Sequence, residues 1–366
     1  MQLQWEESLL LKEESEIRGH FQNDRRKLFI LAKGFDPRMC RGLRCFMMFA
    51  PDMHVALVNY SETPKSASRT YASDSHVNMQ EFAKISKAEN VDEIVFSMWK
   101  EEGGRKTSLV KQNIGKYFTK EYLEPYDEII VDMSAMPRSI FTVLIKILHK
   151  RRGDRHLSIL VCENSMFDDS ITPTNYFEDA GFLNGIGAYT IGSESDNDKR
   201  TVWFPMLGTG AEENIKKIAD FLRPDEICPI IPFPSIDAAR GDRILKRYEN
   251  ILFRSLEVEK KNIIYVSEFN PISVYVKLCT SVFYFAEALS TLNRGNNPRL
   301  TKFVFSMQSS KLMEVGVLLT VMELIHNEYK AGIAVVENEG YKMDKECYCE
   351  DLNKLYCLCL DDSIYD

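Results

Sequence analysis

The sequence predicts an α/β protein made of two tandem Rossmann-like halves, with mostly parallel sheets flanked by helices. Three observations support this prediction. Short apolar runs alternate with helical stretches along the chain. The runs are continuously apolar, which is typical of strands buried on both faces of a parallel sheet. A polar segment interrupts the alternation near the middle of the chain, after which the pattern begins again.

Length and composition narrow the class of protein. A chain of 366 residues is long enough for about two domains. The formal net charge of −8 disfavours nucleic acid as the main partner, because proteins that follow its backbone carry basic surfaces. No uninterrupted apolar stretch is long enough to span a bilayer, and the charged start of the chain lacks a signal-peptide core. The nine cysteines are then expected to be reduced thiols in a cytoplasmic protein.

The first half is predicted to begin after an acidic, helix-prone leader at residues 1–26. The expected strands are Leu28–Lys33, Arg44–Ala50, Val55–Tyr60, Glu93–Met98, Glu128–Met133 and Leu157–Cys162. The expected helices cover residues 78–89, 107–123 and 138–152. Alternation of this kind predicts βαβ units with right-handed crossovers.

The polar stretch at 164–200 is interpreted as the domain boundary, which gives domains at 27–185 and 186–366. A long surface loop on one continuous sheet would give the same composition. The second half is predicted to contain strands Thr201–Leu207, Glu226–Phe233, Asn262–Ser267, Lys302–Met307 and Gly332–Glu337, and a final edge strand Leu355–Leu360. Its helices are expected at Ala211–Leu222, Arg240–Leu256, Pro271–Leu292 and Lys311–Tyr329.

Polar residues follow several predicted strands, and ligands in doubly wound sheets bind beyond the carboxyl ends of strands. After the first strand, Arg38 is a candidate for holding a carboxylate or phosphate, although a simple turn explains the segment equally well. At residues 132–138 a strand runs directly into a helix that Ser134 or Ser139 can cap, with Pro137 in its first turn. Together with Arg138, this helix start is a candidate anion site.

Two acidic residues are candidates for general acid–base chemistry. Asp132 ends an apolar strand, where an unpaired carboxylate is costly, so it is expected to pair with Arg138 or Arg38. Glu268 follows another apolar strand and can serve as a general base or bind a ribose hydroxyl. Structural caps and ion pairs are the alternative explanation for both.

Three further helix starts contain candidate ligand-binding residues. The segment after residue 233 has Asp237 as the expected N-cap, and its arginines either line a cleft or pair within the helix. In the segment at 306–311, Lys311 lies at the positive end of a helix, where a cation is disfavoured unless an anion offsets it. The candidates are Ser235, Arg240, Arg243, Asn270, Ser309, Ser310 and Lys311. Capping by Asn270 before Pro271 explains that pair without any ligand.

Several known motifs are absent from the sequence. It contains no GxGxxG, GxxxxGK[ST], GxSxG or HExxH pattern, and residues 207–210 lack the remainder of any of these motifs. We therefore expect no cofactor. The histidines show no metal-ligand spacing, and the tail cysteines Cys347, Cys349, Cys357 and Cys359 are interpreted mainly as apolar filling of a strand, with a zinc site as the alternative. No metal is expected.

The segments Asp132–Arg138 and Ser306–Lys311 resemble the ligand-contacting turns of CARF and SAVED domains. These are Rossmann-like sensors of cyclic oligonucleotides in prokaryotic antiviral defence, and SAVED proteins pair two CARF-like halves in one chain. The resemblance implies a pocket lined by Ser134, Arg138, Ser309, Ser310 and Lys311. The chain departs from the glycine-rich, lysine-containing turn common in CARF domains, and no effector domain is evident.

Three hypotheses about function follow. The first is a sensor that binds an anionic, nucleotide-type ligand in a cleft at the strand ends. The second is an enzyme acting on a nucleotide or phosphorylated substrate, with Asp132 and Glu268 as acid–base residues. The third is a non-catalytic subunit of a larger complex, and a protein partner or homo-oligomer is expected in any of these cases.

Overall fold

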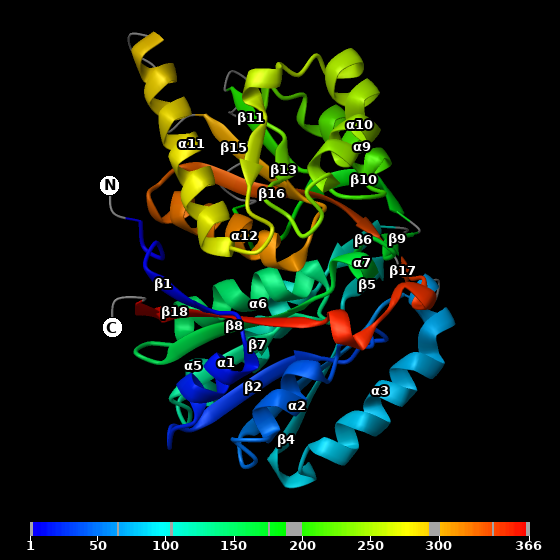
Figure 1. Ribbon diagram of the computed structural model, residues 1–366, viewed down its shortest axis with the longest axis vertical. Helices are drawn as coiled ribbons and strands as arrows, with labels where there is room; N and C mark the ends of the chain where they lie inside the picture. The colour runs from blue at the N-terminus through cyan, green and yellow to red at the C-terminus, as the bar shows by residue number, and fades with distance from the viewer. Residues whose placement is uncertain are drawn as a thin grey trace. The chain divides into compact units, whose positions relative to one another are not determined.

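The computed structural model describes residues 3–63, 66–102, 105–174, 176–187, 200–292, 301–338 and 340–363. The chain divides into two compact units. The N-terminal unit comprises Glu7–Ser170 together with Glu339–Asp366, and the C-terminal unit comprises Met1–Glu6 together with Ile171–Asn338. Each contains a large, mostly parallel sheet flanked by helices, which confirms the predicted fold class (Figure 1).

The sheet of the N-terminal unit has the strand order β1-β18-β8-β7-β2-β3-β4. Its strands are β1 (Ser8–Leu11), β2 (Lys27–Ala32), β3 (His54–Ser61), β4 (Val91–Ser97), β7 (Glu128–Asp132), β8 (His156–Glu163) and β18 (Lys354–Ser363). The helices are α1 (Glu14–Phe21), α2 (Arg41–Met47), α3 (Ala72–Ile85), α4 (Val110–Tyr117), α5 (Lys120–Leu123), α6 (Arg138–Arg151) and α7 (Ser165–Asp168). The hairpin β5 (Trp99–Glu102) and β6 (Arg105–Ser108) precedes α4, and the short β17 (Tyr341–Lys342) precedes β18.

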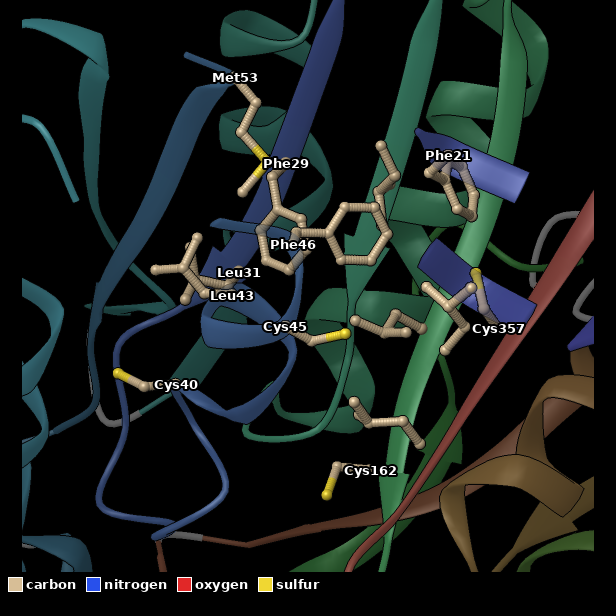
Figure 2. Packing of buried hydrophobic residues seen from close by; sticks show 14 of the residues in the cluster. Phe21, Phe29, Leu31, Cys40, Leu43, Cys45, Phe46, Met53, Cys162 and Cys357 are labelled. Carbon is tan, nitrogen blue, oxygen red and sulfur yellow. The ribbon is translucent and has the colours of Figure 1, made fainter. Parts of the chain in front are cut away.

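The core of this unit on the α1–α3 side is aromatic. Phe46 of α2 lies with its ring centroid 5.1 Å from that of Phe21 in α1 and 5.2 Å from that of Phe29 in β2. Figure 2 shows the three rings together with Cys45 and Cys357, which fill the same cluster. These contacts bury α1 and α2 against the sheet.

The C-terminal unit has the strand order β10-β16-β15-β11-β13-β14, with β12 paired to β11. Its strands are β9 (Thr172–Pro173), β10 (Tyr176–Phe182), β11 (Thr201–Met206), β12 (Glu226–Ile227), β13 (Ile230–Pro232), β14 (Ile264–Val266), β15 (Lys302–Met307) and β16 (Lys330–Asn338). Its helices are α9 (Glu212–Leu222), α10 (Arg240–Glu249), which continues as a π-helical turn at Asn250–Ser255, α11 (Pro271–Leu292) and α12 (Lys311–His326).

The two sheets repeat one topology. Five strands in each are mutually parallel, and counting them in chain order gives the spatial order 3-2-1-4-5 in both units, which matches five of the six strands of the Rossmann order 3-2-1-4-5-6. An antiparallel strand continues each sheet beyond the fifth strand: β18 beside β8, and β10 beside β16. The two halves, which share no residue pattern, therefore share a fold.

Three expectations about individual elements are corrected first. Arg44–Ala50 is not a strand, because α2 occupies Arg41–Met47 and buries Leu43 and Phe46 on one helical face. A short apolar run does not distinguish a buried helix from a strand. The segment Tyr176–Phe182 lies in the polar stretch that was interpreted as a domain boundary, but it forms the edge strand β10. Helix 107–123 is divided into β6, α4 and α5.

Three further corrections concern the two ends of the chain and its division into compact units. The segment at 1–26 is not a separate helical leader, because Ser8–Leu11 pairs with β18 and only Glu14–Phe21 is helical. The strand expected at Leu355–Leu360 exists, but it lies inside the sheet of the N-terminal unit, between β1 and β8, instead of at an edge of the second half. The compact units divide near residue 170, not at 185.

Candidate functional site

Each 3-2-1-4-5 sheet has a topological switch point between its first and fourth strands, and doubly wound sheets commonly bind ligands at this point. In the N-terminal unit it lies between β2 and β7, and in the C-terminal unit between β11 and β15. At both places a glycine follows the first strand closely and packs on the turn after the fourth strand. A Cβ on Gly34 would lie 3.3 Å from the Ala135 carbonyl oxygen, and one on Gly208 would lie 1.6 Å from that of Gln308.

In the N-terminal unit the switch point is lined by a buried ion cluster. Arg38 is 2% exposed. Its Nε donates to Asp36 Oδ1 at 2.9 Å, its Nη2 to Asp36 Oδ2 at 2.8 Å and its Nη1 to Asp168 Oδ1 at 2.7 Å. The guanidinium carbon also lies 5.1 Å from the ring centroid of Phe167. The carboxylates that Arg38 holds are therefore those of the protein itself.

The charges in this cluster decide the state of Arg38. Burial by itself would lower the pKa of the guanidinium, but the carboxylates of Asp168 and Asp36 outweigh burial and raise that pKa well above its ordinary value. Asn78 fastens the same loop, because its amide donates to the carbonyl oxygens of Gly34 and Asp36 at 2.9 Å each. The cluster therefore holds one guanidinium between two carboxylates inside the fold.

The strand-to-helix turn at 132–138 is stabilised by contacts other than the expected serine cap. Asp132 is 2% exposed, and its Oδ1 accepts the Ser134 backbone N–H at 2.9 Å. Ser134 does not cap α6, because its Oγ accepts the Cys162 N–H at 2.8 Å and thereby joins the turn to β8. Pro137 occupies the N-cap position without a side-chain cap. Arg138, at the first position of α6, is half-buried.

In the C-terminal unit the first turn is equally constrained. Tyr248 of α10 donates its hydroxyl to the Gly208 carbonyl oxygen at 2.9 Å, and Trp203 Nε1 donates to Ser306 Oγ at 3.1 Å across β11 and β15. The adjoining Gln308 has a buried Oε1 to which no group in the described part of the chain donates. Such an acceptor needs a donor from water or a ligand.

The start of α12 agrees with the expectation in detail. Ser310 is the N-cap, and its side chain accepts the Met313 N–H at 3.4 Å. Ser309 Oγ lies 3.5 Å from Met313 Sδ. Lys311 is half-buried at the first helical position. This sixteen-residue helix therefore begins, directly after β15, with Ser309, the capping Ser310 and Lys311.

The arginines after β13 have protein partners. Arg240 and Glu268 form an ion pair of 3.0 Å with side chains 7% and 5% exposed. Asp237 is not the N-cap of α10, which is Ala239, although Asp237 Oδ1 accepts the Ala239 N–H at 3.0 Å. Asp237 also pairs with the exposed Arg243, and these two contacts lower the pKa of its carboxyl group.

The remaining predicted residues have local contacts. Ser235 Oγ donates to the Asp237 carbonyl oxygen at 2.6 Å. Asn270 caps α11 as expected, with its Oδ1 accepting from Ile272 N at 3.0 Å and Ser273 N at 3.1 Å. The two suggested acid–base residues belong to different units, Asp132 to the N-terminal one and Glu268 to the C-terminal one.

The tail cysteines do not assemble into a metal centre within the described residues. Cys357 and Cys359 are buried in β18, whereas Cys347 is half-buried and Cys349 exposed. No group of three or more metal-ligating side chains gathers anywhere in the described ranges. Within the same ranges, no helix has the length and apolar character needed to cross a membrane.

Sequence reasoning missed three features of these sites. Asp36 and Asp168 lie 132 positions apart, and nothing in their spacing showed that both would reach Arg38. Gly208 was noted only as part of an incomplete motif. The exposed Phe233 was treated as the end of a strand. The one sequence signal that could have revealed this exposed ring is the position of Phe233 between two prolines at a strand end.

Comparisons with known proteins place no functional name on these sites. No protein-family model matches the chain, and no curated protein matches it in sequence. Among solved structures it is similar to a universal stress protein from Archaeoglobus fulgidus DSM 4304, with 11% identity, a TM-score of 0.23, and 85% of this chain and 96% of that chain covered. It is also similar to the NadR protein in complex with NR, with 9% identity, a TM-score of 0.26, and coverages of 84% and 90%. Matches this distant carry no argument about function.

Proposed function

We propose that this chain binds an anionic, nucleotide-type ligand at the switch point of its C-terminal unit. The observation that carries the proposal is the packing of Gly208 against Gln308, which joins the turn after β11 to the turn that opens α12. A side chain at 208 would collide with the Gln308 carbonyl oxygen, so only glycine allows the two turns to pack this closely. In a doubly wound sheet this is where ligands bind.

The residues at the start of α12 favour an anionic ligand. The unsatisfied N–H groups of a helix N-terminus and the helix dipole attract negative charge. Lys311, at the first helical position, can contact a phosphate bound at this helix start, and Ser309 adds a hydroxyl that can donate to it. Gln308 Oε1 is available to accept from a ligand hydroxyl or amine.

The equivalent place in the N-terminal unit is less suited to a ligand. Arg38, in the loop after β2, is already paired with Asp36 and Asp168. A third anion there would meet a cluster whose net charge is negative. We therefore assign the ligand to the C-terminal unit and a structural role to Arg38.

The resemblance to CARF and SAVED domains supports a more specific proposal. In this proposal the ligand is a cyclic oligonucleotide, and binding regulates a partner protein in a defence system instead of starting turnover. The burial of Asp132 and Glu268 in contacts of their own units agrees with a sensor better than with acid–base catalysis.

Calorimetric titration tests the proposal, with pyrophosphate, mononucleotides and cyclic oligonucleotides as probes. The Lys311→Ala variant should weaken binding of any phosphate-bearing probe about tenfold or more, because a charge-assisted hydrogen bond contributes about 1.5–3 kcal/mol. The matched control is Lys216→Ala, which removes an exposed lysine from α9 of the same unit. If no probe binds, or if both variants bind like the wild type, the proposed site is wrong.

A further inference from the structure

The C-terminal unit exposes two aromatic rings beside the proposed site. Phe233 directly follows β13 and is 52% exposed, and Tyr265 in the middle of β14 is 47% exposed. Their ring centroids are 6.2 Å apart with an interplanar angle of 80°. Large apolar side chains this exposed, and adjacent to each other, commonly mark a binding surface.

The backbone beneath these rings is firmly held. Phe233 N donates to the Val266 carbonyl oxygen at 2.7 Å, and Glu268 N donates to that of Pro234 at 3.0 Å. The buried Arg240–Glu268 ion pair connects the same two loops again. Phe233 is therefore a ring presented in a defined position and not a side chain on a loose loop, which lowers the entropic cost of stacking a ligand on it.

The topology sets the distance from these rings to the proposed phosphate site. The strand order β15-β11-β13 places two inter-strand spacings between the end of β15, which leads to Ser309, and the end of β13, which leads to Phe233. Two spacings amount to roughly 10 Å. This matches the scale on which the base and the phosphate of an extended nucleoside 5′-phosphate are separated.

We propose that Phe233, with Tyr265 packed against it, is a stacking platform for the nucleobase of the ligand. This inference rests on the proposed function and deepens it: the ligand is a nucleotide whose base lies over β13 and whose phosphate lies at the start of α12. The Arg240–Glu268 pair acts as a positioning element below the platform. Stacking of a base on an aromatic side chain contributes about 1–3 kcal/mol.

Three probes separate the two proposals: pyrophosphate, AMP and adenosine, each titrated calorimetrically into the full chain. Phe233→Ala should weaken AMP and adenosine about tenfold and leave pyrophosphate unchanged. Phe233→Trp should retain AMP binding, since a larger ring still stacks. Lys311→Ala should weaken AMP and pyrophosphate but not adenosine. The matched control Tyr284→Ala removes a 68% exposed aromatic residue of α11 and should change nothing.

The outcomes are distinguishable. If Lys311→Ala weakens AMP and pyrophosphate while Phe233→Ala changes neither AMP nor adenosine, the proposed function stands and the base platform is refuted. If adenosine binding depends on Phe233 while pyrophosphate does not bind, the platform stands and the phosphate site is wrong. Equal weakening of all three probes by Phe233→Ala would show a general structural effect and would also overturn the platform.

Discussion

Gly208 lies against Gln308 so closely that a Cβ atom on Gly208 would be 1.6 Å from the Gln308 carbonyl oxygen. The obstacle is backbone, which cannot rotate away as a flexible side chain can. The pair brings the first and fourth strand ends of the C-terminal unit into direct contact. It is the tightest point of the candidate site.

The first prediction follows from this contact. Gly208→Ala should force the two turns apart, lower the free energy of unfolding by about 1–3 kcal/mol and abolish binding of phosphate-bearing probes. The control is Gly181→Ala in β10, where a Cβ would have no neighbour within 4 Å. Thermal unfolding and calorimetry measure the two effects, and a Gly208→Ala protein as stable as Gly181→Ala would contradict the described packing.

The second prediction concerns the ion cluster of the N-terminal unit. Arg38→Ala leaves Asp36 and Asp168 without their shared cation, and breaking a buried ion pair from one side costs about 3–5 kcal/mol. Arg38→Lys should also destabilise, since one ammonium group cannot reproduce contacts made by Nε, Nη1 and Nη2. Denaturant unfolding should show both losses. The exposed Arg18→Ala in α1 should be near neutral, and equal stability of all three variants would remove the structural role assigned to Arg38.

The third prediction tests the structural role of the ion pair between Arg240 and Glu268. Glu268→Gln and Arg240→Met should each destabilise the protein, because each leaves a buried charge uncompensated. The double variant should recover part of that loss, and the cycle should give a coupling energy of about 0.5–3 kcal/mol. Additive losses in unfolding free energy would mean that the two side chains do not stabilise each other.

The fourth prediction concerns the thiols. Seven of the nine cysteines are buried, whereas Cys347 is half-buried and Cys349 exposed. Burial raises the pKa of the Cys228 and Cys40 thiols to about 12, so both remain protonated and unreactive at neutral pH. Brief labelling with a thiol reagent should therefore modify only Cys347 and Cys349, and denatured protein should take up nine labels. Fast labelling of Cys228 in the folded protein, read by peptide mass spectrometry, would refute its burial.

Much of the local structure could be predicted from the sequence. The continuous apolar runs of β2, β7, β8 and β15 form the predicted strands, and nearly every residue in them is buried, as expected for strands covered on both faces. Asn270 and Ser310 also cap α11 and α12 as expected, since capping depends on residues only two or three positions away.

The predictions from sequence were wrong at segments whose structure is decided by tertiary contacts and not by the local pattern. Arg44–Ala50 is as apolar as a strand, and only the packing of Phe46 on Phe21 and Phe29 makes α2 the lower-energy choice. Serine is a common helix cap, but the hydroxyl oxygen of Ser134 accepts the backbone N–H of Cys162 in the neighbouring strand instead.

By itself, then, the sequence determined the class of fold, most of the alternation of strands and helices and the caps of α11 and α12, because these depend on neighbours along the chain. The tertiary structure decided the strand order, the joining of β18 to the first sheet and the partners of each charge. Many of these depend on residues far apart in the chain, such as Arg38 and Asp168 or the strands β8 and β18, whose contact is set by the energy of the whole packed unit and not by any local pattern.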